Sequence, residues 1–111
     1  MATILVRLDS RRLSNPDVNI RYVLPDLLVE RSAGVISDDG YDFVGEESFL
    51  VLFLKAFHLE AALACVLDVV ENVRVLDNDL RSAAVVAVQR EGGPEVIYPP
   101  DFAGSILSPA N

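Results

Sequence analysis

Two adjoining stretches decide the fold: Gly34-Val-Ile-Ser-Asp-Asp-Gly-Tyr-Asp-Phe-Val-Gly-Glu-Glu-Ser48 and Phe49-Leu-Val-Leu-Phe-Leu-Lys-Ala-Phe57. The second stretch is the most apolar run of the chain, and both of its alternating rows of side chains are apolar. The first stretch is polar, is interrupted by glycines and is rich in carboxylates. We therefore predict an irregular strand that leads into a central strand buried on both faces.

Length and composition indicate a single domain. The chain has 111 residues, of which 51% are hydrophobic, and this suffices for one core but not for two. We expect the domain to span residues 1–111, with residues 99–111 as a C-terminal tail after Pro99-Pro100. Seventeen acidic residues against nine basic ones give a net charge of -8. This charge repels phosphate backbones and argues against nucleic acid as a partner, whereas it suits a basic protein or simply favours solubility.

The chain shows no pattern for export or for crossing a membrane. Its one cysteine, Cys65, cannot form an internal disulfide and lies in an apolar helical pattern. Residues 1–7 lead directly into a strand pattern without a basic region before it. The longest uncharged apolar run, 49–54, is far shorter than the ~20 residues that span a bilayer. We expect a cytoplasmic protein with no membrane partner.

The remaining elements follow from local patterns. Pro25 would break a helix interior, so we expect residues 20–23 to be extended and a short helix to begin at Pro25, with Gly34 as its left-handed cap. Asp39-Gly40 predicts a turn or bulge in the polar stretch. The predicted strands cover 3–8, 35–36 with 41–44, 49–57, 83–89 and 95–98, and the predicted helices cover 25–32 and 58–72.

This order predicts an α+β fold, a ferredoxin-like split βαβ sandwich with an antiparallel four- to five-stranded sheet and two helices on one face. Helices on one face cover only one row of the apolar strand at 49–57. The second row then requires the C-terminal tail, a second copy of the chain or a different partner as its cover.

No cofactor, metal or catalytic motif is recognised. Acidic residues crowd one hairpin and one connector, but neither spacing matches a calcium loop. His58 has no nucleophile at a motif spacing and stands where it would cap a helix; an enzyme on this fold would need a pocket around it. Arg7, Arg11 and Arg12 make the one basic spot, where a phosphate or carboxylate could dock, although pairing with the chain's own acids explains it more simply.

The middle of the chain resembles the small acidic single-domain immunity proteins of bacterial toxin systems. The similarity lies in Ser37-Asp38-Asp39-Gly40-Tyr41-Asp42-Phe43 before a buried strand, in Glu60-Ala-Ala-Leu63 and in Asp77-Asn78-Asp79-Leu80. Such proteins bind a cognate toxin domain and block its active site or substrate entry, without catalysis of their own.

The resemblance implies a non-catalytic module whose partner is a toxin protein with a basic surface. Tyr41 would be the amphipathic anchor and the carboxylates would face lysines or arginines. The implied partner-binding residues are Asp38, Asp39, Tyr41, Asp42, Glu46, Glu47, Asp77 and Asp79. The alternative is a homodimeric ferredoxin-like domain, ligand-sensing or structural, in which two sheets pack through Leu50, Leu52 and Leu54 or through the opposite aromatic row.

Overall fold

The computed structural model describes residues 1–45, 48–104 and 106–107. In chain order the elements are β1 (Ala2–Asp9), the 3-10 turn η1 (Ser10–Arg12), α1 (Ile20–Arg31), β2 (Ile36–Val44), β3 (Phe49–Ala56), α2 (Leu59–Asn72), β4 (Arg74–Val75), β5 (Asn78–Asp79), β6 (Ala84–Arg90) and β7 (Gly93–Tyr98). The described residues thus contain two α-helices and a five-stranded antiparallel sheet of order β2-β3-β1-β6-β7. The predicted α+β class is confirmed, and β4 pairs with β5 in a small separate sheet.

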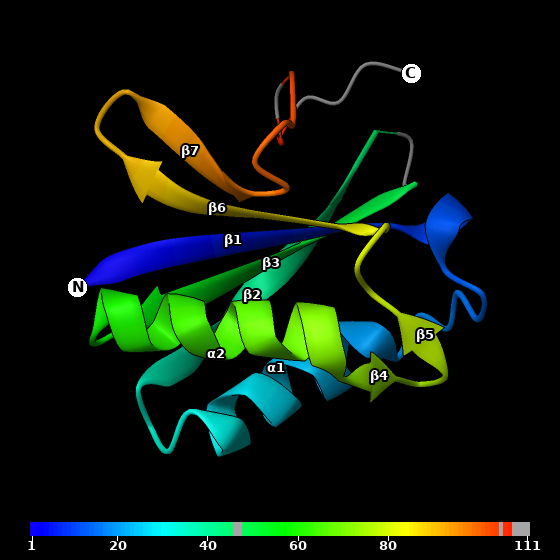
Figure 1. Cartoon of the computed structure of the whole chain (residues 1–111), viewed down its shortest axis with the longest axis horizontal. Coiled ribbons are helices and arrows are strands. Elements are labelled where there is room, and N and C mark those ends of the chain that lie inside the picture. Colours follow the sequence, from blue (N-terminus) through cyan, green and yellow to red (C-terminus); the bar gives the residue numbers. More distant parts are fainter. Residues whose placement is uncertain (46–47, 105, 108–111) are drawn as a thin grey trace.

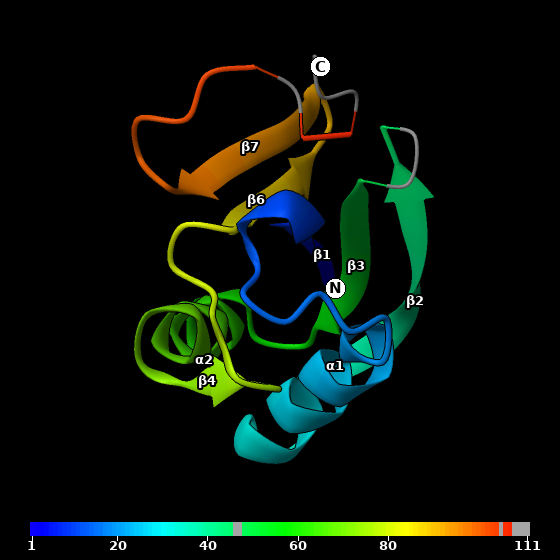
Figure 2. The same cartoon turned by 90° about the vertical axis from the view of Figure 1, so that its right-hand side faces the viewer.

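The two helices lie on the same side of the sheet (Figures 1 and 2). Alternation along β1 and β3 sends Ile4, Val6 and Leu8 and their partners Leu54, Leu52 and Leu50 toward the helices. There they form one buried cluster with Leu24 and Leu28 of α1 and Ala62 and Val66 of α2. We call this the helix-side face of the sheet.

The opposite face, which we call the tail-side face, is covered by the C-terminal tail. Leu5, Val51, Val85 and Ala87 form a second buried cluster with Ile106, and Phe102 packs against it. Figure 2 shows the segment after β7 on the side of the sheet that faces away from α1 and α2. The tail, one of the three covers predicted for the second apolar row, therefore packs against this face.

The prediction for α1 was wrong at its start. Residues 20–23 belong to a continuous helix from Ile20 to Arg31, and Pro25 lies inside it. Proline removes one helical hydrogen bond, but Ile20, Leu24, Pro25 and Leu28 are all buried, and burial of this stripe outweighs the lost bond. The spacing of Ile20, Leu24 and Leu28 indicates this face, and the proline rule concealed it. Gly34 has a positive φ of 90°, but the left-handed residue directly after the C-cap Ser32 is Ala33, with a φ of 53°, so the cap was predicted one residue too late.

The other boundaries lie close to the predictions. α2 begins at Leu59, and the Nδ1 of His58 accepts a 3.3 Å hydrogen bond from the backbone N–H of Ala61, so His58 caps the helix as expected. The extension predicted at 95–98 is a full edge strand, β7. No helix within the described ranges is long and apolar enough to cross a membrane.

Candidate functional site

The polar stretch of the sequence forms β2, an edge strand of the main sheet (Figure 1). Four of the predicted contact residues, Asp38, Asp39, Tyr41 and Asp42, lie on this strand and are exposed. Glu46 and Glu47 lie outside the described residues. An exposed edge strand presents backbone donors and acceptors together with its side chains, so β2 is accessible to a partner.

A bulge interrupts the pairing of β2 with β3, as Asp39-Gly40 predicts. The register shifts between Asp38 and Tyr41, and Gly40 has a φ of 98°, a value that glycine adopts without strain. The Oδ1 of Asp38 accepts a 2.9 Å hydrogen bond from the backbone N–H of Gly40. The carboxylate of Asp38 therefore shapes the bulge.

Alternation along β2 separates Tyr41 from part of the acidic group. Tyr41 lies opposite Leu52, on the helix-side face, whereas Asp42 lies opposite Val51, on the tail-side face. Asp39 forms a 3.8 Å ion pair with Lys55. The sequence predicts a single patch, but the pleat of β2 divides its members between two faces.

Tyr41 is instead the middle ring of an aromatic cluster. Its ring lies 5.9 Å from that of Tyr22 in α1 and 5.7 Å from that of Phe43, and both pairs are edge-to-face. The guanidinium of Arg21 lies over Tyr22 and Tyr41, at 4.4 and 5.6 Å from the ring centroids. Hydrogen bonding from Arg21 lowers the pKa of Tyr22. Tyr22 was not among the predicted contact residues, since its contact with Tyr41 depends on residues 20–23 being helical.

This cluster is exposed to solvent although it is apolar in large part. Tyr22 is 48% exposed, Tyr41 40% and Phe43 37%. Large aromatic side chains that cluster at the surface are typical of protein contact sites, because they bury much area and lose few rotamers on binding. Val18, next to the start of α1, adds a further exposed apolar side chain.

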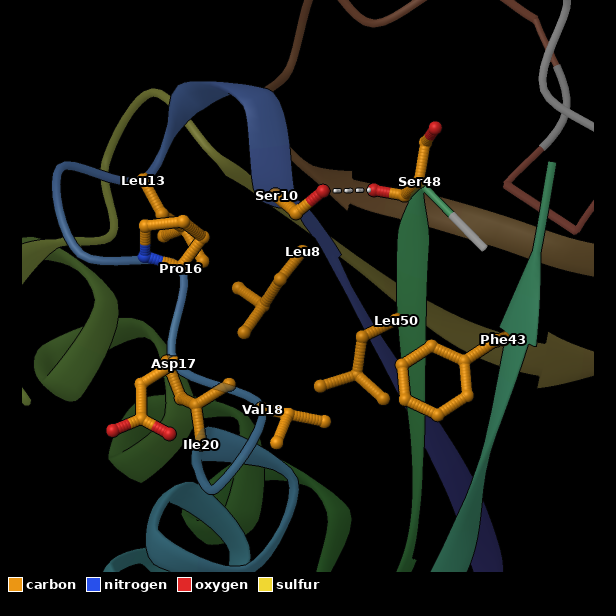
Figure 3. A pocket seen from close by; sticks show the side chains of 10 residues that line it. All are labelled: Leu8, Ser10, Leu13, Pro16, Asp17, Val18, Ile20, Phe43, Ser48 and Leu50. Carbon is orange, nitrogen blue, oxygen red and sulfur yellow. Dashed lines mark hydrogen bonds between the residues drawn. The ribbon is translucent and has the colours of Figure 1, made fainter. Parts of the chain in front are cut away.

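Two hollows flank the cluster, toward opposite ends of β2. The first is an apolar cavity of about 440 Å³ beside Phe43, walled by Leu8, Leu13, Ile20 and Leu50 (Figure 3). At its rim the Oγ of Ser10 donates a 2.9 Å hydrogen bond to the carbonyl of Ser48. Such a cavity accepts an apolar side chain of a partner.

The second hollow is acidic. Asp26 and Glu30, one turn apart on α1, border it together with Asp38 of β2, and Phe57 lies beside them with 58% of its surface exposed. Three carboxylates around one hollow favour a lysine or arginine side chain. We define the β2 edge surface as Tyr22, Asp26, Glu30, Asp38, Tyr41 and Phe43.

Asp77 and Asp79 do not belong to this surface. They lie in the β4–β5 turn and strand, where the Oδ2 of Asp79 accepts a 2.6 Å hydrogen bond from Arg81. Hydrogen bonding to Arg81 lowers the pKa of Asp79 to about 2. Asn78, between them, is fully buried and exchanges two 2.7 Å hydrogen bonds with the backbone of Asn15. Through these hydrogen bonds, Asn78 anchors the β4–β5 segment to the loop before α1.

The structure shows no preformed metal site in the described part of the chain, since no group of three or more histidine, cysteine or acidic side chains is placed to hold an ion. Cys65 is half-buried, and burial raises the pKa of its thiol. Its sulfur lies 4.0 Å from the carbonyl of Leu28, where it packs α2 against α1.

The chain was compared with protein-family models, with curated proteins and with solved structures, and none of the three comparisons gave a match.

Proposed function

We propose that the protein is a non-catalytic binding module, an immunity protein that binds and neutralises a cognate bacterial toxin domain with a basic surface. The observation that carries this proposal is the β2 edge surface, which combines three exposed aromatic rings with a carboxylate-lined hollow. Aromatic anchors supply binding energy, and surrounding charges supply specificity and fast association.

The proposal includes a ferredoxin-like split βαβ arrangement. The chain order β1-α1-β2-β3-α2-β6 and the sheet order β2-β3-β1-β6 support it, with β7 as an additional edge strand. In this arrangement α1 lies beside the edge strand that follows it. That neighbourhood brings Tyr22, Asp26 and Glu30 of α1 next to β2.

Tyr41 is the central anchor in the proposed complex. It stands between the two hollows, so a partner that covers its ring also reaches the apolar cavity beside Phe43 and the acidic hollow at Asp38. The hydroxyl groups of Tyr22 and Tyr41 provide hydrogen bonds within an otherwise apolar contact. A toxin domain bound here would have its basic active-site rim covered by this surface.

The homodimer alternative has less support. Its first contact row, Leu50, Leu52 and Leu54, is buried against the helices. Its second row lies on the tail-side face, where Ile106 packs against Val51 and Leu5. A dimer through either face of the sheet would have to displace a helix or the tail, whereas a different partner at the β2 edge displaces nothing.

Growth rescue in bacteria tests the proposal. A candidate toxin domain with a basic surface is co-expressed with the wild type or with a double variant, Asp26→Lys and Glu30→Lys. We expect rescue by the wild type and loss of rescue by the variant, since repulsion replaces attraction in the hollow. The control is Glu71→Lys with Glu91→Lys, which makes the same charge change at exposed positions outside the surface. Rescue by both variants would refute the proposed site.

A further inference from the structure

The apolar cavity beside Phe43 has the size and the walls of a small-molecule site. Its volume of about 440 Å³ lies within the roughly 300–1,000 Å³ that such sites occupy. The side chains of Leu8, Ile20 and Leu50 are buried and point into it (Figure 3). Val18 and Phe43 are the exposed apolar members of its lining, so they border its opening. A ligand that enters between them contacts buried aliphatic side chains.

Hydrogen bonds hold the walls of this cavity in place. Leu8 and Leu50 are directly opposite each other in the paired strands β1 and β3. Pro16 lies in the loop before α1, next to Asn15, whose backbone exchanges two 2.7 Å hydrogen bonds with the buried side chain of Asn78. A cavity whose walls are fixed before binding loses little conformational freedom when a ligand enters.

Ser10 lines the rim and can offer a ligand only an acceptor. Its hydroxyl donates a 2.9 Å hydrogen bond to the carbonyl of Ser48, and its backbone N–H donates to the same carbonyl at 3.0 Å. Because a hydroxyl has one proton, the Oγ of Ser10 has only lone pairs left for a further partner. The hydroxyl of Ser48 and the carboxylate of Asp17 point away from Leu50 (Figure 3). A ligand that matches this rim carries a hydrogen-bond donor.

The charges around the cavity favour an uncharged ligand. No basic residue is among the described residues that line it, whereas Asp17 is, and the chain has a net charge of -8. An anion is therefore repelled. An ammonium group would lose its water against aliphatic walls, at a large cost in free energy.

We propose that this cavity binds a small uncharged aromatic molecule that carries one N–H or O–H donor, as indole and phenol do. The ring packs against Leu8, Leu50 and Phe43, and the donor forms a hydrogen bond to the Oγ of Ser10. The site shares Phe43 with the β2 edge surface, but it does not depend on the proposed toxin partner.

Fluorescence anisotropy of indole, titrated with the full chain, tests the proposal. The chain contains no tryptophan, so the emission of the indole ring comes from the ligand alone. N-methylindole is the matched probe, because it has the same ring without the N–H donor. We expect saturable binding of indole with a Kd below about 1 mM, and binding of N-methylindole about fivefold weaker because it lacks one hydrogen bond.

Two variants with matched controls locate the site. Ser10→Ala removes the acceptor, so the two probes should then bind within about twofold of each other, whereas Ser82→Ala, at an exposed serine outside the cavity, should keep their difference. Phe43→Ala removes a wall and should weaken indole binding about fivefold. Phe57→Ala, at an exposed phenylalanine outside the cavity, should change it less than about twofold.

N-acetyltryptophanamide carries the indole ring on a peptide backbone, whose amide groups would lose water against Val18 and Phe43. It should bind more weakly than free indole. Equal or tighter binding would assign the cavity to a side chain of a partner and overturn the proposal. Absence of saturable indole binding, or an unchanged difference between the two indole probes in Ser10→Ala, would also overturn it. No toxin is present in these titrations, so their failure leaves the growth-rescue test of the proposed function unaffected.

Discussion

The two faces of the sheet are buried in different ways. Two helices close the helix-side face over a large cluster of buried apolar side chains. The tail closes the other face mainly through Ile106 and Phe102, and charged Arg7 and Asp9 are buried beside this cluster. A face that is closed by packed helices specifies the fold. A face that is closed by a short tail leaves room for charged groups.

The largest effect on stability should come from the helix-side face. Leu54→Ala removes a fully buried side chain from the main core and leaves a cavity between β3 and the helices. We expect a loss of about 2–5 kcal/mol in the free energy of unfolding, measured by urea denaturation. A loss below about 1 kcal/mol would mean that the helices do not close this face as described.

The tail-side face should respond less to an equivalent change. Ile106→Ala also removes a buried apolar side chain, but the tail can detach locally, and this limits the loss to about 1–2 kcal/mol. Leu107→Ala is the control. The side chain of Leu107, next to Ile106 in the sequence, is exposed and should contribute less than about 0.5 kcal/mol. Equal losses for Leu54→Ala and Ile106→Ala would remove the distinction between the two faces.

The charges of the tail-side face should make stability depend on pH. Burial alone would raise the pKa of Asp9, but hydrogen bonds from Arg11 and the charges of Arg11 and Arg12 outweigh it, so the pKa is lower in the folded state. The unfolded chain then binds the proton first as pH falls, and the stability that Asp9 contributes above about pH 4 is lost below it.

Asp9→Asn should therefore lower stability at pH 7 by about 1 kcal/mol and flatten its decline between pH 4 and pH 2. Thermal unfolding midpoints of the variant and the wild type across this range provide the measurement. Parallel curves for the two proteins would show that folding does not lower the pKa of Asp9.

The smallest effect on stability should come from the β2 edge surface. Tyr41→Ala removes an exposed ring with two edge-to-face contacts, and we expect a loss below about 1 kcal/mol. Denaturation measured beside Leu54→Ala provides the comparison. A loss as large as that of Leu54→Ala would make Tyr41 a core residue and would weaken its proposed role as an anchor.

The sequence predicts the sheet well because its information is local. Alternation in 49–57 identifies a strand buried on both faces, and the need for a second cover follows from it. The packing of the tail on this face depends on Phe102 and Ile106, whose isolated positions in the tail have no period to interpret. Only the folded chain brings them to Leu5 and Val51.

The candidate sites were harder to predict because they combine distant segments. The acidic stretch identifies Asp38, Tyr41 and Asp42, but it does not give the separation of Tyr41 from Asp42 across the pleat or the contribution of Tyr22 from α1. Because proline usually breaks a helix interior, Pro25 favours an extended segment at Tyr22, but Tyr22 lies in α1. On the tail-side face, Arg7 and Arg81 are far apart in the sequence but line the same cavity, since β1 pairs with the strand that follows Arg81.

Hydrogen–deuterium exchange of the chain, alone and mixed with a candidate toxin domain that has a basic surface, tests the central claim most directly. The account predicts that binding slows exchange of backbone amides in β2 (36–44) and in α1 (20–31), which together carry the β2 edge surface. Exchange in β6 and β7 (84–98) should stay unchanged. Protection confined to β6 and β7, with none in β2, would contradict the account.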